Sequence, residues 1–65
     1  MQQRVQQYVD EKTVSRITGL ALPTLRNYRH KRKGPPYVKL GRAVRYSLDD
    51  VREFMEARKI QTEQI

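Results

Sequence analysis

The sequence predicts a small, mainly α-helical domain that carries one β-hairpin. Three observations predict it: apolar residues recur at helical spacing in three short segments, glycine and proline separate these segments, and two β-favouring runs flank Gly41-Arg42. With 65 residues the chain has room for only one hydrophobic core. We therefore expect one domain over residues 8–59, between a flexible N-terminus (1–7) and a C-terminal tail (60–65).

A first helix is predicted from Glu11 to about Thr18. Asp10 suits its N-cap, because an aspartate oxygen can accept a hydrogen bond from a free N–H of the first turn. Gly19 should end the helix. Val14 and Ile17 are three residues apart, so both are expected on the face that packs against the core.

A second helix is predicted to follow after a turn of only a few residues. Pro23 fits the first turn of this helix, where its missing N–H costs nothing, and the helix should run to about Lys31. Leu25 and Tyr28 are again three apart and are expected to face the first helix.

A two-stranded hairpin is predicted next, because the segment Lys33-Gly34-Pro35-Pro36 cannot continue a helix. The strands are Tyr37–Leu40 and Ala43–Tyr46, joined at Gly41-Arg42. The residues expected to share one face of the hairpin are Val38, Leu40, Val44 and Tyr46.

A third helix is predicted from Leu48 to about Lys59. Ser47 with Asp50 three positions later approximates a capping box, and the apolar set Val51, Phe54 and Met55 should face the core. The complete order is helix, tight turn, helix, hairpin, helix, which is the order of a winged helix-turn-helix.

The whole chain carries a net charge of +7, and its positive residues are concentrated in the middle of the sequence. No acidic residue lies between Glu11 and Asp49, whereas the same stretch holds Lys12, Arg16, Arg26, Arg29, Lys31, Arg32, Lys33, Lys39, Arg42 and Arg45. The predicted second helix and the hairpin are therefore both basic. A helix fits the major groove of B-DNA and a hairpin beside it can reach the flanking backbone or minor groove, so the pattern predicts binding to double-stranded DNA.

The sequence resembles the MerR-like excisionase domain family, which includes phage excisionases and AlpA-like regulators. The resemblance covers about Val9 to Lys59 and is carried by Ile17-Thr18-Gly19-Leu20, Thr24-Leu25-Arg26-Asn27-Tyr28, Val38-Lys39-Leu40-Gly41-Arg42-Ala43-Val44-Arg45-Tyr46 and Asp49-Asp50-Val51-Arg52-Glu53-Phe54. It implies site-specific DNA binding without catalysis.

Three functions remain open at this point. The resemblance implies an excisionase, a recombination directionality factor that bends attachment-site DNA and steers a tyrosine integrase toward excision. Such proteins often bind repeated sites cooperatively, and residues 59–65 are the expected integrase contact. The alternatives are a small AlpA-like transcriptional regulator and, from another class, an RNA-binding or adaptor module, although a two-stranded wing offers little platform for stacking RNA bases.

Arg26 and Asn27 are the expected base contacts, because arginine pairs with guanine and asparagine with adenine in the major groove. An ordinary solvated helix face is the alternative interpretation. Arg42 at the hairpin tip is the expected wing contact, although charged hairpin residues also protect open sheet edges. The full predicted DNA-binding set is Pro23, Thr24, Arg26, Asn27, Arg29, His30, Lys31, Arg32, Lys39, Arg42 and Arg45.

Ala21 stands where related sequences usually place serine, threonine or aspartate, so the second helix lacks a side-chain cap. Its free N–H groups are expected to bind a DNA phosphate. Catalysis, disulfides, an ordinary zinc site and any cofactor are not expected, because the chain has no cysteine, one histidine and no recognisable catalytic set. No stretch is long and apolar enough for a membrane span or a signal peptide, so we expect a cytoplasmic protein without a membrane partner.

Overall fold

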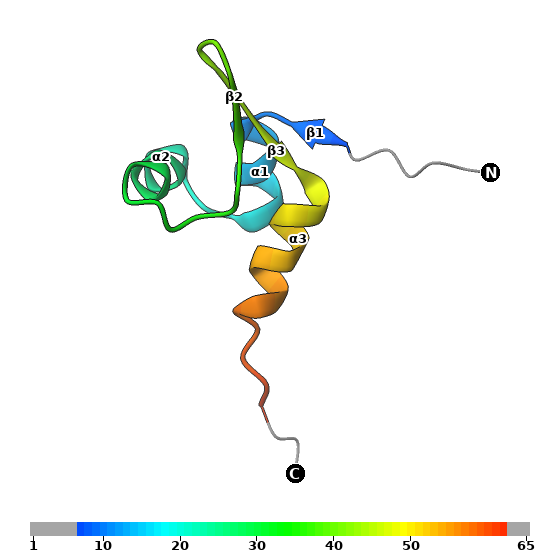
Figure 1. The fold of residues 1–65 in the computed structure, drawn as a ribbon. Coiled ribbons are helices and arrows are strands. Elements are labelled where there is room, and N and C mark those ends of the chain that lie inside the picture. Colours follow the sequence, from blue (N-terminus) through cyan, green and yellow to red (C-terminus); the bar gives the residue numbers. More distant parts are fainter. Residues whose placement is uncertain (1–6, 63–65) are drawn as a thin grey trace, which may run out of the picture.

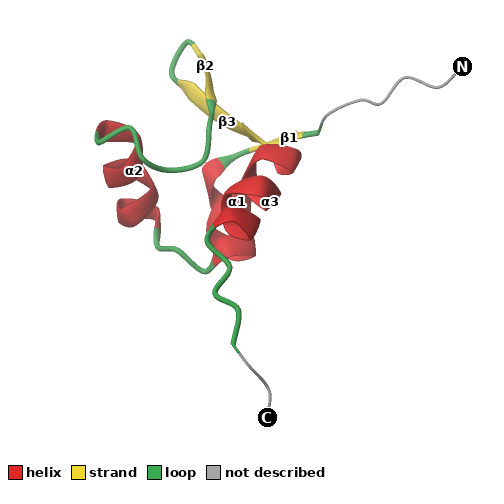
Figure 2. Ribbon diagram, turned by 60° about the horizontal axis from the view of Figure 1, so that its bottom comes forward, coloured by secondary structure: helices red, strands yellow, loops and turns green. Residues whose placement is uncertain are grey.

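The computed structural model describes residues 7–62 and shows three helices and a small antiparallel sheet. The elements in chain order are β1 (Tyr8–Val9), α1 (Glu11–Thr18), α2 (Leu22–His30), β2 (Val38–Leu40), β3 (Ala43–Ser47) and α3 (Leu48–Ala57). The β2–β3 hairpin projects beyond the helices, and α2 stands to one side of α1 and α3 (Figures 1 and 2). The winged helix-turn-helix prediction is confirmed.

The sheet has a third strand that the sequence did not predict. Its strand order is β1-β3-β2, and β1 pairs with β3 through Tyr8 opposite Ser47 and Val9 opposite Tyr46. The carbonyl of Gln7 accepts a hydrogen bond of 2.9 Å from the N–H of Leu48. A strand of two residues has no readable alternation, and it forms here because β3 offers a free edge. The predictions for residues 1–6 and 63–65 lie outside the described residues.

The register of the hairpin corrects the predicted apolar face. Val38 lies opposite Arg45, Lys39 opposite Val44, and Leu40 opposite Ala43. Residues directly opposite each other share a face, so Val38 and Leu40 lie on one side of the sheet while Val44 and Tyr46 lie on the other. The expectation that these four residues share a face was wrong. The two-residue turn places each even-numbered residue of one strand opposite an odd-numbered residue of the other, so the even-numbered residues of β2 and β3 lie on opposite faces.

Four side chains form the fully buried apolar core, one from each of α1, α2, β3 and α3. They are Val14, Leu25, Tyr46 and Val51, each at most 1% exposed, and Val9, Leu20, Leu22 and Val44 pack against them. Every element except the edge strands therefore contributes one anchor.

Ile17 and Met55, both predicted to face the core, are instead exposed to more than 40%. Each lies close to the C-terminal end of a short helix, where the neighbouring elements no longer cover it. The side chain of Tyr28 is half-buried, and its Cβ would lie 3.0 Å from a Cβ at Gly34. Tyr28 thus packs on the loop after α2, whereas the sequence predicted that it faces α1.

The predicted helix ends are largely confirmed. Asp10 accepts a hydrogen bond of 2.9 Å from the N–H of Thr13, and Ser47 accepts one of 3.4 Å from the N–H of Asp50. Gly19 ends α1 at φ 78°, a left-handed conformation that favours glycine. Helix α3 ends at Ala57, two residues before the predicted end.

Two hydroxyl groups shape the turn between α1 and α2. Ser15 Oγ donates to the carbonyl of Leu20 at 2.6 Å, while Thr18 Oγ donates to the carbonyl of Val14 at 2.8 Å and accepts from the N–H of Leu20 at 3.1 Å. The two bonds to Leu20 satisfy backbone groups that a tight turn would otherwise leave free. Together the three bonds hold the turn that sets the direction of α2 relative to α1.

Leu25→Ala tests whether the stability of the domain depends on the four buried side chains of this core. Removing a fully buried leucine side chain is expected to cost about 2–5 kcal/mol, as much as the whole stability of about 3–5 kcal/mol that a domain of this size commonly has. The matched control is Leu40→Ala, which changes a leucine that is 66% exposed and should cost no more than about 0.5 kcal/mol. Urea denaturation followed by circular dichroism measures both, and similar losses in the two variants would contradict this core.

Candidate nucleic-acid interface

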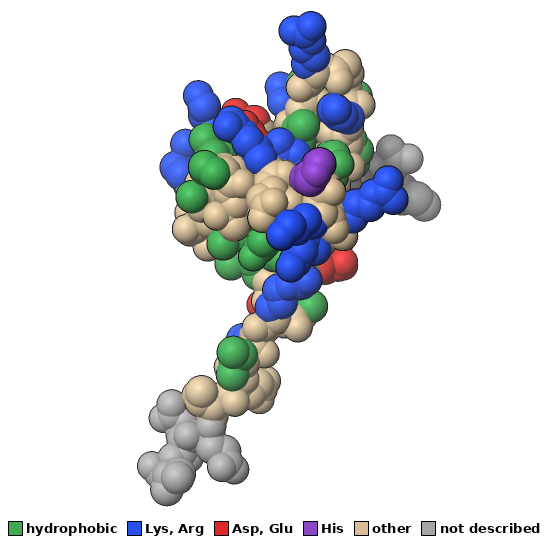
Figure 3. Space-filling model, turned by 90° about the vertical axis from the view of Figure 1, so that its left-hand side faces the viewer, with side chains coloured by type: hydrophobic (Ala, Val, Ile, Leu, Met, Phe, Trp, Pro, Cys, Tyr) green, Lys and Arg blue, Asp and Glu red, His purple; other side chains and the backbone are tan. Residues whose placement is uncertain are grey.

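An open groove lies between α2 and the hairpin and brings positive side chains of both elements together. Its volume is about 480 Å³, and it is lined by Arg26, Arg29, His30, Tyr37, Lys39, Arg42 and Val44. Figure 3 views the molecule from the α2 side, where lysine and arginine side chains gather over α2 and the hairpin and few acidic side chains show. The structure thus brings Arg26 and Arg29 of α2 together with Lys39 and Arg42 of the hairpin on one side of the molecule.

The hairpin register decides which basic residues reach this groove. Lys39 shares a sheet face with Val44, which packs against the core, so Lys39 lies on the α2 side. Gly41 at φ 62° occupies the first central position of the turn, as type II′ turns require, and Arg42 follows it at the tip. Arg45 pairs with Val38 and belongs to the other face.

Arg26 is held by an acidic residue of the neighbouring helix. Its Nη2 donates to Glu11 Oε2 at 2.7 Å and its Nε donates to Glu11 Oε1 at 3.4 Å. The Arg26 side chain is nevertheless 57% exposed, whereas that of Glu11 is 21% exposed. The guanidinium is therefore fixed along one edge and open to solvent along another.

Arg29 connects α2 with both α1 and the sheet. Its Nη1 donates to Glu11 Oε1 at 3.2 Å and to Tyr46 Oη at 2.8 Å, and its guanidinium carbon lies 5.8 Å from the centre of the Tyr37 ring. The Tyr37 and Tyr46 rings are 6.1 Å apart. With a side chain only 17% exposed, Arg29 is a structural link at the floor of the groove.

The remaining predicted site residues are distributed around this groove. Pro23, Asn27, His30, Lys31, Arg32, Lys39 and Arg42 are exposed, while Thr24 and Arg45 are half-buried. Arg45 lies apart from the groove floor and near Asp10. Hydrogen bonds from Thr13 lower the pKa of Asp10, and the charge of Arg45 adds to this effect. Helix α2 begins at Leu22 after Ala21, which makes no side-chain cap, so its missing cap is confirmed.

The C-terminal end of α2 adopts a Schellman motif with an arginine in the left-handed position. The N–H of Lys33 donates to the carbonyl of Tyr28 at 2.9 Å, and the N–H of Arg32 donates to that of Arg29 at 3.1 Å. Arg32 has φ 57°, where glycine is the usual residue. This non-glycine residue therefore carries backbone strain of about 1 kcal/mol or more.

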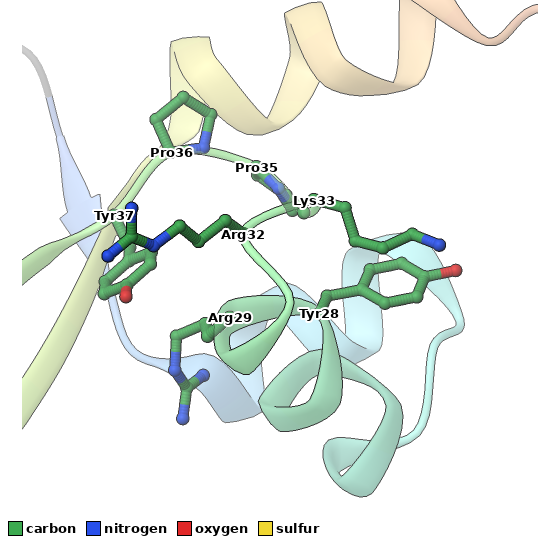
Figure 4. A pocket seen from close by; sticks show the side chains of 8 residues that line it. Tyr28, Arg29, Arg32, Lys33, Pro35, Pro36 and Tyr37 are labelled. Atoms are coloured by element: carbon green, nitrogen blue, oxygen red, sulfur yellow. The ribbon is translucent and has the colours of Figure 1, made fainter.

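A second hollow lies beside this strained residue, at the junction of α2 and the wing (Figure 4). Arg32 extends toward Tyr37, and Lys33 runs along Tyr28, with Nζ 5.8 Å from the ring centre. Arg29 points away from Pro35 and Pro36, and it lines both this hollow and the groove. Positive charge thus continues from the groove around the end of α2.

Hydrogen bonds from Arg26 lower the pKa of Glu11 below its ordinary value of 4.5. Partial burial opposes this effect, while the charges of Arg26 and Arg29 add to it. Glu11 therefore stays ionised well into the acidic range and continues to hold both arginines.

The sequence did not identify Glu11, Tyr37 or Val44 as part of this site. Arg26 and Arg29 are three residues apart on α2, which places both on one helix face, but their shared partner is 15 and 18 positions away. Only the angle at which α2 packs on α1 brings Glu11 between them. The one feature of the sequence that points to this partner is the acidic residue in the first turn of the preceding helix.

The profile of the helix-turn-helix domain family matches residues 5–59 of the chain. The chain belongs to this family. It is a small DNA-binding helix-turn-helix protein, and the family includes excisionases and AlpA-like DNA-binding proteins. No curated protein and no solved structure gives a significant match to the sequence.

In this helix-turn-helix domain, α2 has the position of the recognition helix and the β2–β3 hairpin that of the wing. Within residues 7–62, no helix is long and apolar enough to cross a bilayer. Within the same part of the chain, no group of three or more histidine, cysteine or carboxylate side chains is placed to hold a metal ion.

The stability of the domain should fall in acid because of the carboxylates that cap and cross-link α1. The folded-state pKa values of Asp10 and Glu11 are both lowered, so their contribution is fully present above the ordinary pKa values of 3.8 and 4.5 and is lost as the pH falls through the lower folded values. Glu11→Gln should therefore lose less stability than the unchanged protein between pH 6 and pH 2. Urea titrations across this range test it, and parallel curves for the two proteins would refute it.

Proposed function

We propose that this protein is a phage-type excisionase of the MerR-like kind: a recombination directionality factor that binds and bends attachment-site duplex DNA without catalysis. In this role it favours excision by a tyrosine integrase. The observation that supports the proposal most strongly is the groove in which α2 and the wing present their cations together.

The proposed binding mode places α2 in the major groove. Arg26 and Asn27 lie on its exposed side and would read base edges, with Thr24 and His30 beside them. The uncapped start of α2, which begins at Leu22, has free N–H groups that suit a backbone phosphate. Pro23 lies in this first turn and has no N–H of its own, so its expected contact with DNA is through its ring.

The wing supplies the second part of the interface. Arg42 at the hairpin tip reaches the adjacent minor groove or backbone, and Lys39 contacts a phosphate between the wing and α2. Lys31 and Arg32 extend the positive surface past the end of α2, and Arg45 is a more distant phosphate contact from the opposite face of the sheet. Contacts on both sides of α2 favour a bent duplex, because bending brings more phosphates to the wing.

An AlpA-like transcriptional regulator would use the same surface on a promoter. An in vitro excision assay with a tyrosine integrase and its attachment-site DNA separates the two functions. The excisionase proposal expects the protein to raise the excision rate and to bind repeated sites cooperatively. An unchanged rate, together with specific binding at a promoter, would assign the regulator function instead.

Arg26→Ala and Arg42→Ala should weaken DNA binding in different ways. If Arg26 reads a base, its loss should cost about 1–3 kcal/mol at the preferred sequence and relax the preference at one position. Loss of Arg42 should weaken binding to all duplexes evenly and reduce the slope of log K against log salt by about one unit. Fluorescence anisotropy over a salt series measures both effects, and a reversed pattern would exchange the two roles.

Arg52→Ala is the matched control for these two variants. Arg52 lies on α3, its side chain is 70% exposed, and it is 3.7 Å from Asp49. Its loss removes the same charge at a distance from the groove and should change binding much less. A duplex affinity that falls equally for all three variants would point to net charge alone.

Arg32→Gly should separate stability from binding. Glycine adopts the left-handed backbone at this position without strain, so the free energy of unfolding should rise by about 1 kcal/mol. Duplex affinity should fall, because the Arg32 guanidinium is lost from the positive surface. Lys33→Gly is the control: it removes a charge next in sequence without relieving a positive φ, so it should weaken binding but not stabilise the fold. A stabilised Arg32→Gly with unchanged affinity would exclude Arg32 from the interface.

A further inference from the structure

We infer that Glu11 is a specificity-determining positioning residue that orients Arg26 for reading one base pair. This inference rests on the proposed DNA-binding function of the groove and deepens it. It concerns an acidic residue in a surface where attraction to phosphate would favour only positive ones.

The geometry of the Glu11–Arg26 pair carries the inference. Both Glu11 carboxylate oxygens are engaged by Arg26, through Nε at 3.4 Å and Nη2 at 2.7 Å. This side-on contact uses the Nε–Nη2 edge of the guanidinium and leaves the Nη1–Nη2 edge free. That free edge is the one whose two parallel N–H groups match the O6 and N7 acceptors of guanine.

Glu11 is itself rigidly placed. It is the first residue of α1, directly after the Asp10 N-cap, where the positive end of the helix dipole favours a carboxylate. Its Oε1 also accepts from Arg29 at 3.2 Å, and Arg29 is anchored to Tyr46 at 2.8 Å. A carboxylate fixed in this way reduces the side-chain freedom that Arg26 would otherwise lose on binding a base.

Stability alone is a weak explanation for this pair. Ion pairs of exposed side chains contribute little to folding, and Arg26 is 57% exposed. An acidic residue beside the groove also repels DNA phosphates, which lowers the affinity for every duplex. A gain in base discrimination offsets that loss, whereas a purely structural role does not require the Nε–Nη2 geometry.

The experiment compares base preference with general affinity for DNA. The unchanged protein, Glu11→Gln, Glu56→Gln and Arg26→Ala are each used to select duplexes from a randomised library, and each is titrated with mixed-sequence genomic DNA. Glu56→Gln is the matched control, because Glu56 is an exposed glutamate on α3 whose nearest cation, Lys59, is 3.7 Å away. Both glutamate variants raise the net charge by one unit.

We expect Glu11→Gln to lose about tenfold in preference at one base-pair position, the same position at which Arg26→Ala loses it. Its affinity for mixed-sequence DNA should be unchanged or higher, because a negative charge is gone. Glu56→Gln should keep the full preference. A Glu11→Gln variant that selects the same sequence as strongly as the unchanged protein would overturn the inference.

Val51→Ala separates orientation of Arg26 from a general loosening of the domain. Val51 is a buried core residue of α3, and its truncation leaves the bonds of Glu11 with Arg26 and Arg29 in place. It should lower the melting temperature and keep the base preference. Loss of the same preference in Val51→Ala would show that loosening alone explains the effect, and the inference would fail.

One further result distinguishes failure of the proposed function from failure of this inference alone, and another applies if a variant does not fold. If the unchanged protein selects no preferred duplex, the DNA-reading function fails and this inference fails with it. If Glu11→Gln does not fold, NMR of the unchanged protein decides: the Arg26 Nε–H should exchange slowly with solvent both free and bound to the selected duplex. Fast exchange in the complex would show that Arg26 leaves Glu11 on binding, which contradicts the inference.

Discussion

The arrangement of this domain depends on one guanidinium, that of Arg29, which joins the recognition helix to the rest of the molecule. It donates to Glu11 on α1 and to the Tyr46 hydroxyl on β3, and it lies near the Tyr37 ring at the start of the wing. A core of four buried side chains leaves few other contacts to fix the angle of α2. The polar link therefore sets the relative position of the two elements that form the groove.

The hairpin depends on a different constraint, its strand register, which decides which side chains face α2. Its two-residue turn places Lys39 and Val44 on the side of α2 and turns Val38 and Leu40 outward. The same turn puts Arg42 at the tip, where it is farthest from the core. A turn of one more residue would reverse the faces and remove Lys39 from the groove.

Much of this fold could be predicted from the sequence because its signals are local. Asp10, Gly19 and Ser47 mark helix ends through bonds within a few residues, and all three act as predicted. Strand β1 and the outward position of Ile17 could not be predicted in this way, because both depend on what the neighbouring elements cover.

The candidate site, too, could be predicted from the sequence only in part. The basic character of α2 and the wing is visible in the sequence, and their meeting in one groove follows from the order of the elements. The roles of individual arginines are not visible there. Arg26 and Arg29 have the same residue type and the same helix face, yet one is 57% exposed and the other 17%, because only Arg29 lies under the Tyr46 hydroxyl.

The central claim is that α2 and the wing act together as one surface for duplex DNA. Backbone amide chemical-shift mapping tests it most directly, with ¹⁵N-labelled protein titrated with a short duplex. The largest shifts should fall on α2 and on the hairpin from Lys39 to Arg42, with α3 little changed. Shifts centred on α3, or on the outward sheet face at Val38 and Leu40, would contradict the account.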